Sequence, residues 1–254
     1  MTSSLINYTL HLADNSLILG HRNSEWCGHG PILEQDIAIT NISLDLIGQA
    51  RNFYQYAAML TNEQDETNIN EDSFAYFRNS EEFKNILLVE LPKGDWAQTI
   101  LRQFMFSIWQ NLLFEKLKAS NDQQVSAIAT KALKEIAYHL RWSSEWVIRL
   151  GDGTEESHMR MEKAIKELWS YAGEMFVPAN YELEMLNNGG GTNVALLKES
   201  WVANVEKVFS QAGLIIPSVS TIHTGGKEGR HTEYLQQILN ELQSVARAHP
   251  TATW

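Results

Sequence analysis

The chain has 254 residues, a formal net charge of −11 and a pI of about 5.2, with 44% hydrophobic and 20% charged residues. This composition is typical of a soluble globular protein, and the length is sufficient for one large domain with a substantial core. The excess of acidic residues argues against binding to nucleic acid or to anionic membrane surfaces, because both require a basic surface.

Cysteine content and the N-terminal sequence exclude two further classes. Cys27 is the single cysteine, so neither a disulfide within the chain nor a cysteine-rich metal site can form. The segment MTSSLINYTLHLADNS lacks the basic region and apolar core of a signal peptide. No apolar run is long enough to span a bilayer. We therefore expect a cytoplasmic protein that does not bind membranes.

In chain order, the apolar periodicity predicts two long helices first. One runs from Leu5 to about Asn23 and ends at the turn Cys27–Pro31; the next, over Ile32–Leu60, has no interior proline. A helix of that length spans roughly 43 Å, as in a large four-helix bundle. Its packed face is predicted to contain Ile37, Asn41, Leu44, Gly48 and Ala50.

The next segments predict a loop, a short helix and two more long helices. Thr61–Asp72 is polar and acidic, which is typical of a solvated loop. A short helix begins near Ser80 and ends before Pro92. Asp95 is a predicted N-cap for a helix over Trp96–Ala119, which Gln123–Leu150 follows.

The last part of the chain is helical but more interrupted. A fifth long helix is predicted over Glu155–Met175, and the glycine-rich segment Asn187–Thr192 forms a flexible connection. Helices are predicted over Asn193–Gln211 and Thr232–Ala246, with irregular structure over Pro217–Gly229.

No segment shows the alternation of a strand, and no linker separates independent units. The sequence therefore predicts an all-α fold with long helices in a single domain over residues 1–254. We expect a core bundle over about 5–176 and a helical C-terminal extension over about 193–248.

The segment Lys131–Trp146, KALKEIAYHLRWSSEW, resembles part of a di-iron motif. A di-iron carboxylate bundle takes a Glu from each of two helices and Glu-x-x-His from each of the other two. The fourth long helix offers Glu135-x-x-Tyr138 and the second offers Asp45-x-x-Gly48. Each keeps an acid in the first position and lacks the histidine.

We expect the fourth helix to turn one face inward, carrying Glu135, Tyr138, Trp142 and Glu145. A working metal centre would require His139 to turn inward and another residue to replace Gly48. The favoured alternative is that Asp45 and Glu135 are buried and paired with Arg51, Arg141 or Tyr138, because an unpaired buried charge is costly.

The other long helices offer few further ligands. The first carries His11 and Asp14, and the third carries Gln103, Ser107 and Gln110 near its centre. Five other histidines are expected to be solvated, in predicted loops or on predicted surfaces: His29, His158, His223, His231 and His249.

The segment Thr224–Leu235, TGGKEGRHTEYL, is not a phosphate-binding loop, since no Gly-Lys-Ser/Thr follows a strand. Its glycines are expected to shape a turn. Lys227 and Arg230 could serve an interaction that the sequence leaves unspecified.

Four blocks, in order along the chain, resemble the C subunit of the bacterial phenylacetyl-CoA ring epoxidase. They are SEWCGHGPILEQDIAITNISLDLIGQARNF (Ser24–Phe53), NILLVELPKGDWAQTI (Asn85–Ile100), KALKEIAYHLRWSSEW and TGGKEGRHTEYL. Together they span nearly the whole chain, except that residues 180–220 do not align clearly.

The resemblance implies a ferritin-like fold and a place in an enzyme that epoxidises the aromatic ring of phenylacetyl-CoA with oxygen and electrons from a reductase. It implies that the di-iron site lies in the catalytic A subunit and that this chain is a non-catalytic structural subunit packed against it. Asp45, Gly48, Glu135 and Tyr138 would then be vestigial metal positions. The alternative is an autonomous di-iron oxygenase with atypical ligands.

The resemblance also implies contacts with the coenzyme A part of the substrate near the subunit interface. The residues are Glu82, Phe83, Lys84 and Asn85, and Leu183, Glu184 and Met185. Phe83 could stack on adenine and Lys84 could face a phosphate, or both could be structural. Trp26, Trp169, Trp201 and Met185 are candidate anchors for a partner.

Overall fold

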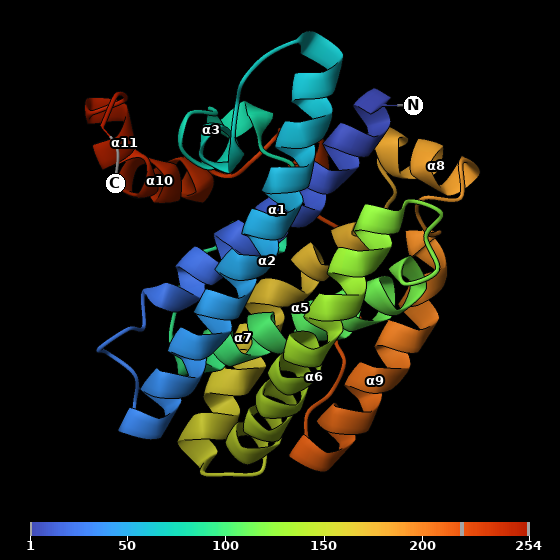
Figure 1. Ribbon diagram of the computed structural model, residues 1–254. Helices are drawn as coiled ribbons and strands as arrows, with labels where there is room; N and C mark the ends of the chain where they lie inside the picture. The colour runs from blue at the N-terminus through green and yellow to red at the C-terminus, as the bar shows by residue number, and fades with distance from the viewer. Residues whose placement is uncertain (1, 219–220, 253–254) are drawn as a thin grey trace.

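The computed structural model describes residues 2–218 and 221–252 (Figure 1). Within these ranges the chain forms helices, turns and loops, and no β-strand is present. None of the described helices combines the length and the apolar character needed to cross a membrane. The predicted all-α fold is therefore confirmed.

Four long helices form the bundle: α1 (Thr2–Ser24), α2 (Leu33–Asp65), α5 (Trp96–Leu117) and α6 (Gln123–Gly151). The most extensive helix pairings are α1 with α2 and α5 with α6. Each pair is joined by a short loop, so its helices run antiparallel, as Figure 1 shows. A long connection joins the two pairs, which is the ferritin-like arrangement.

The connection between the pairs contains three short elements: α3 (Glu71–Tyr76), a 3₁₀ turn (Ser80–Glu82) and α4 (Leu87–Glu90). The sequence predicted a loop up to Asp72, which is wrong at both ends. Helix α2 continues to Asp65, and the side chain of Asn70 caps α3 by accepting from Ser73 N. A charged segment thus becomes helical because a cap satisfies its first backbone groups.

The remaining elements pack around the bundle. They are α7 (Glu155–Ala172), a 3₁₀ turn (Gly173–Phe176), α8 (Asn180–Asn187), a 3₁₀ turn (Val194–Leu196), α9 (Leu197–Ala212), a 3₁₀ turn (Gly226–Glu228), α10 (Glu233–Leu242) and α11 (Ser244–Ala248). Helix α8 was not predicted. Nε1 of Trp201 on α9 donates to the Met105 carbonyl at 2.9 Å, and one hydrophobic core continues from the bundle into α9.

The long helices lie where they were predicted, with ends that differ by at most five residues. The single short helix predicted between Ser80 and Pro92 is wrong, because residues 83–86 are not helical and separate a 3₁₀ turn from α4. Asp95 caps α5 as expected, because its side chain accepts from Gln98 N. The irregular segment predicted over Pro217–Gly229 contains only a 3₁₀ turn where it is described, and residues 219–220 lie outside the described ranges. The single domain with its two parts remains a prediction.

The predicted packing faces of two helices are wrong. On α2, Ile37 and Leu44 are exposed, as are Asn41 and Gly48; only Ala50 of the predicted face is buried. The buried face carries the residues Ala38, Ile39, Ile42, Ser43, Leu46, Gln49 and Phe53. Helix α2 has apolar residues on two sides, so periodicity alone could not identify the side that faces the core.

On α6, the inward residues are Ile136, His139, Ser143 and Val147. Of the predicted face, only Trp142 is buried, while Glu135 is half-buried and Tyr138 and Glu145 are exposed. The core therefore follows the apolar positions and includes one histidine, rather than following the acidic positions.

Two buried glutamates hold the loop before α10 in place. Glu90 on α4 accepts from Nδ1 of His231 at 2.7 Å and from the backbone N of Thr232 at 2.6 Å. Glu174 accepts from Gly225 N at 2.8 Å. These bonds fix the loop to the bundle, so the prediction that His231 is solvated is wrong.

A third buried glutamate, Glu182 on α8, pairs with Lys227 of the same loop, with Nζ 2.8 Å from Oε2. Lys227 is 3% exposed and also donates to the Val177 carbonyl. Its charge is therefore used inside the protein and is not available for an external partner.

His231 gives stability a defined pH dependence. Its two ring nitrogens face Oε2 of Glu90 and the Phe83 carbonyl, so only the doubly protonated ring satisfies both acceptors. Burial opposes this charge, but Glu90 and the carbonyl outweigh it and raise the pKa of His231 above 6.5. The resulting stabilisation is complete below pH 6.5 and is lost as the pH rises through the raised pKa.

We predict that His231→Gln costs about 1–2 kcal/mol of unfolding free energy at pH 6 and less at pH 9. Urea unfolding of both proteins across this range measures the difference. A cost that is constant with pH would show that the ring is neutral in the folded state. His249→Gln, at an exposed residue, is the control.

Candidate functional site

Side-chain hydrogen bonds at the centre of the bundle connect all four long helices. Nε2 of Gln110 on α5 donates to Oε1 of Gln49 on α2 at 3.0 Å and lies 3.5 Å from Oγ of Ser16 on α1. Nε2 of Gln49 donates to Oε2 of Glu135 on α6 at 2.9 Å. Ser16, Gln49 and Gln110 are at most 2% exposed. We call these four residues the amide relay.

Amides suit this position because each side chain both donates and accepts without carrying a charge. A second pair lies nearer one end of the bundle, where Asn23 donates to Oε1 of Gln103 at 2.7 Å and Gln103 donates to Ser107 at 2.9 Å. Since the bundle is buried here, these bonds are needed to offset the desolvation of the polar groups.

Asp45 and Glu135 are half-buried at the α2–α6 contact rather than fully buried. Nε2 of His139 donates to Oδ2 of Asp45 at 3.0 Å, and Gln49 is the partner of Glu135. The predicted pairing with Arg51, Arg141 or Tyr138 is therefore wrong. Arg51 pairs with Glu71.

The residues present do not fit a di-iron centre. Gly48 and Tyr138 are exposed, so the predicted vestigial positions do not meet inside the bundle. His139 does turn inward, but Gln49 and Gln110 occupy the centre and an amide neither neutralises nor bridges two metal ions as a carboxylate does. Among the described residues no group of three or more His, Cys, Asp or Glu side chains could hold a metal ion.

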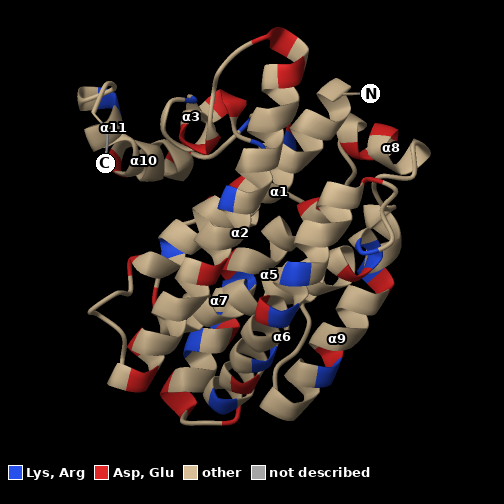
Figure 2. Ribbon diagram, viewed as in Figure 1, with Lys and Arg blue, Asp and Glu red and all other residues tan. Residues whose placement is uncertain are grey.

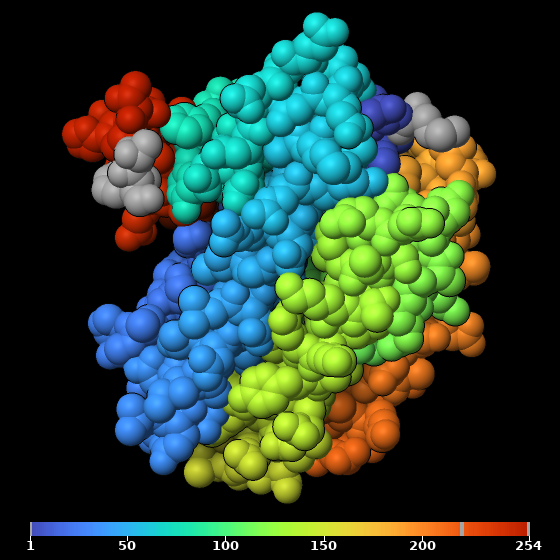
Figure 3. All heavy atoms as spheres, in the orientation of Figure 1, coloured from blue at the N-terminus to red at the C-terminus, as the bar shows by residue number. Residues whose placement is uncertain are grey.

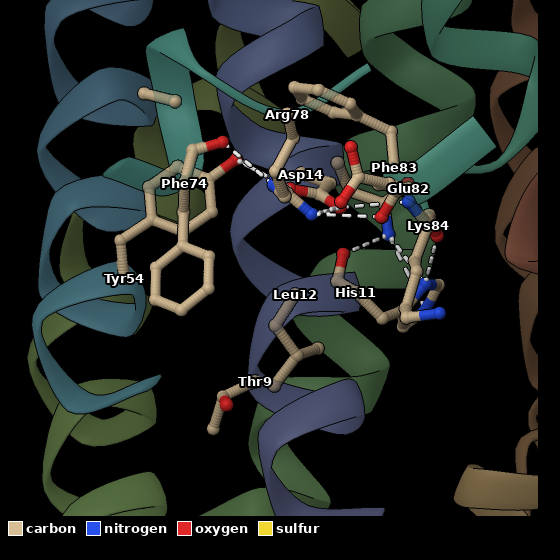
Figure 4. A network of polar contacts seen from close by, with 12 residues as sticks. Thr9, His11, Leu12, Asp14, Tyr54, Phe74, Arg78, Glu82, Phe83 and Lys84 are labelled. Carbon is tan, nitrogen blue, oxygen red and sulfur yellow. Dashed lines mark hydrogen bonds and ion pairs between the residues drawn. The ribbon is translucent and has the colours of Figure 1, made fainter. Parts of the chain in front are cut away.

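A second polar network surrounds Asp14 of α1, which is completely buried (Figure 4). Its carboxylate accepts from the hydroxyl of Tyr54 on α2, from both terminal nitrogens of Arg78, and from the backbone N of Lys84 at 2.8 Å. Burial and the Asp14 charge raise the pKa of Tyr54, which therefore remains a donor. Asp14 thus fixes the segment between α3 and α4 to α1.

This network determines which of residues 82–85 are accessible. The Arg78 guanidinium lies 4.1 Å from the centre of the Phe83 ring, and Phe83 is 0% exposed, so its ring offers no face to a ligand. Asn85 is also buried, where it donates to Glu90 at 2.7 Å. Glu82 is exposed and Lys84 is half-buried.

The second predicted segment lies on α8, beside the first. Leu183 and Glu184 are exposed, and Met185 is buried. Nζ of Lys84 lies 5.7 Å from the centre of the Tyr181 ring on α8, so the two segments are neighbours in space. Burial lowers the pKa of Lys84.

The sequence did not identify the residues that hold Asp14, the 82–85 segment and the amide relay in place. His11 donates to the Lys84 carbonyl at 2.7 Å, and burial lowers the pKa of His11 to about 4, so it is neutral at pH 7. Arg78 and Gln49 were missed because their partners lie 64 and 61 residues away along the chain. The i, i+3 spacing of His11 and Asp14 was the only available signal.

Comparison with known proteins shows the family of the chain. A family model described as phenylacetic acid catabolic protein matches residues 1–254. The chain belongs to this family. A relative from Escherichia coli (strain K12), named as the C subunit of 1,2-phenylacetyl-CoA epoxidase, is 43% identical over 252 residues, which is 99% of this chain and 100% of the relative. In this member of the family, the amide relay occupies the bundle centre.

We predict that Gln49→Leu destabilises the protein by about 2–3 kcal/mol, because Gln110 and Glu135 both lose a partner in a desolvated site. Chemical denaturation measures this cost. Gln124→Leu, at an exposed position on α6, should change stability by less than about 0.5 kcal/mol. Equal effects of the two substitutions would contradict a structural role for the relay.

Proposed function

We propose that this chain is the non-catalytic, structural C subunit of a multicomponent phenylacetyl-CoA epoxidase of aerobic phenylacetate catabolism, acting in the cytoplasm. The observation that carries the proposal is that Gln49 and Gln110, the two neutral amides of the relay, occupy the place where a catalytic bundle needs carboxylates. The name of the E. coli relative supports the assignment to this enzyme.

In this proposal the di-iron centre belongs to the catalytic A subunit, and this chain supports that subunit and contributes no cofactor of its own. Its centre is held by hydrogen bonds among four helices, so the bundle needs no metal to be stable. An autonomous di-iron oxygenase is the alternative, and it would have to use Asp45, Glu135 and His139, of which the two acids are already paired within the bundle.

We further propose that phenylacetyl-CoA lies near the surface formed by the 82–85 segment and α8. Glu82, Lys84, Leu183 and Glu184 are its accessible members, and Lys84 offers the positive charge that a phosphate requires. Phe83, Asn85 and Met185 are buried and would not contact the substrate. Their role would be to hold the two segments in place. The contact between Lys84 and Tyr181 supports one continuous surface.

We predict that the chain expressed alone contains no stoichiometric iron, whereas the complex that it forms with the A subunit holds about two irons for each catalytic chain. Elemental analysis of both preparations measures this. Glu135→Ala should leave the iron content of the complex unchanged, provided that the complex still forms. About two irons in the isolated chain, removed by Glu135→Ala, would establish the alternative function.

We predict that Lys84→Ala in the assembled epoxidase raises KM for phenylacetyl-CoA about five- to tenfold with little change in kcat, since it removes a charge that contacts a part of the substrate remote from the ring. Lys166→Ala, at an exposed position on α7, is the matched control. Unchanged steady-state kinetics for Lys84→Ala would place the coenzyme elsewhere.

A further inference from the structure

One face of α2 carries a stripe of exposed apolar side chains. Leu33, Ile37 and Leu44 are 72%, 53% and 62% exposed. Their spacing, with Asn41 and Gly48, places them along one side of the helix over roughly 22 Å. Isolated exposed apolar residues are normal, but several on one helix face are typical of an interaction surface.

Helix α6 extends this surface. Tyr138 is 36% exposed, and its spacing places it between Glu135 and Trp142, which both reach α2: Glu135 through Gln49, and Trp142 through a bond of Nε1 to Gln35 at 3.0 Å. Figure 3 shows α2 and α6 side by side across one face of the molecule, with no other described segment over them. We call this surface, with Asp45 and Glu135, the α2–α6 seam.

The seam contains two acids that, among the described residues, pair with no lysine or arginine. Asp45 and Glu135 each use one oxygen in a bond within the chain, and Asp45 retains 35% of its side-chain exposure. Among the described residues, no lysine or arginine pairs with either carboxylate: Arg51 binds Glu71, and Arg141 lies over the Tyr138 ring. Figure 2 shows acidic and basic residues interspersed along the ribbons of α2 and α6.

The two carboxylates lie at neighbouring levels of the α2–α6 contact. Asp45 is paired across the contact with His139, and Gln49 with Glu135. Because each helix advances one turn between its two residues and the helices are antiparallel, Asp45 and Glu135 are about one helical turn apart along the helix axes. A single cation could therefore interact with both.

Gly48 makes close approach possible. A Cβ atom at this residue would have no neighbour within 4 Å, so nothing in the described chain requires glycine here. The absence of a side chain leaves room for an element of another molecule to cross α2 at this point.

We propose that the α2–α6 seam is the docking surface for a second, related helical bundle, which lays an amphipathic helix along α2 and places a lysine or arginine between Asp45 and Glu135. This inference rests on the proposed function, in which the catalytic subunit is that bundle. Of the candidate anchors named from sequence, Trp201 and Met185 are buried in the core, whereas Trp26 and Trp169 are half-buried and stay predictions.

A second copy of this chain fits the seam poorly. A twofold contact through the seam would bring Asp45 and Glu135 of both copies together, and like charges across an interface are unfavourable. The net charge of −11 adds to this repulsion. A partner with a basic residue removes it and satisfies the free carboxylate oxygens.

The first test measures binding of Ile37→Lys and Leu44→Lys to the tagged catalytic A subunit from the same source. Each substitution places a charge at an apolar residue that the partner would bury in the complex. We expect it to weaken binding at least about 30-fold. Met159→Lys is the matched control, because Met159 is 55% exposed on α7, outside the seam. Circular dichroism and thermal unfolding of the free variants verify that they are folded.

The second test removes the charges. Asp45→Asn and Glu135→Gln should each weaken binding about five- to tenfold at low salt, with a smaller loss at about 0.5 M NaCl, because salt screens the pairing with the partner's cation. Glu162→Gln, at an exposed position on α7, should bind as the wild type does.

The outcomes separate the two proposals. If the wild-type chain does not bind the A subunit, the proposed function fails and this inference fails with it. If the wild type binds and the Lys variants bind equally well, only the inference is overturned. Wild-type self-association that Ile37→Lys abolishes would overturn the choice of a related bundle as the occupant.

Discussion

The hydrogen bonds of Gln49 are the interaction on which the bundle centre depends. This one amide accepts from Gln110 on α5 and donates to Glu135 on α6, and Gln110 reaches Ser16 on α1. Polar groups at the centre of a four-helix bundle need partners, because an unpaired buried polar group costs about 1–3 kcal/mol. Among the side-chain amide atoms of Gln49 and Gln110, Oε1 of Gln110 alone has no partner within the described chain. Here side-chain amides perform the task that metal coordination performs in a di-iron bundle.

The buried acids of this protein serve the same structural purpose. Asp14, Glu90 and Glu174 each accept bonds from backbone N–H groups of a connecting segment, and Asp14 and Glu90 also pair with a cation. A carboxylate can satisfy several donors at once, so each acid fixes an irregular segment that has no regular backbone pairing. Through Asp14, this organises the 82–85 segment that we propose lies near the substrate.

Sequence periodicity was sufficient for the number and extent of the long helices, and the cap at Asp95 followed from local chemistry. The orientation of α2 could not be predicted, because Ile37 and Leu44 are as apolar as the residues that face the core. The buried positions of Lys227 and His231 were missed for a different reason. Their partners, Glu182 and Glu90, are 45 and 141 residues away, and no local pattern records such a contact.

The mistaken assignment of the α2 face is itself informative about function. Apolar periodicity on two sides of a helix is expected when one side packs in its own core and the other packs in a partner. This pattern agrees with the structural role that we propose for the chain. Its interior needs only its own side chains, while its exposed face, with Asp45 and Glu135 beside the stripe, retains apolar surface and charge that a partner can satisfy.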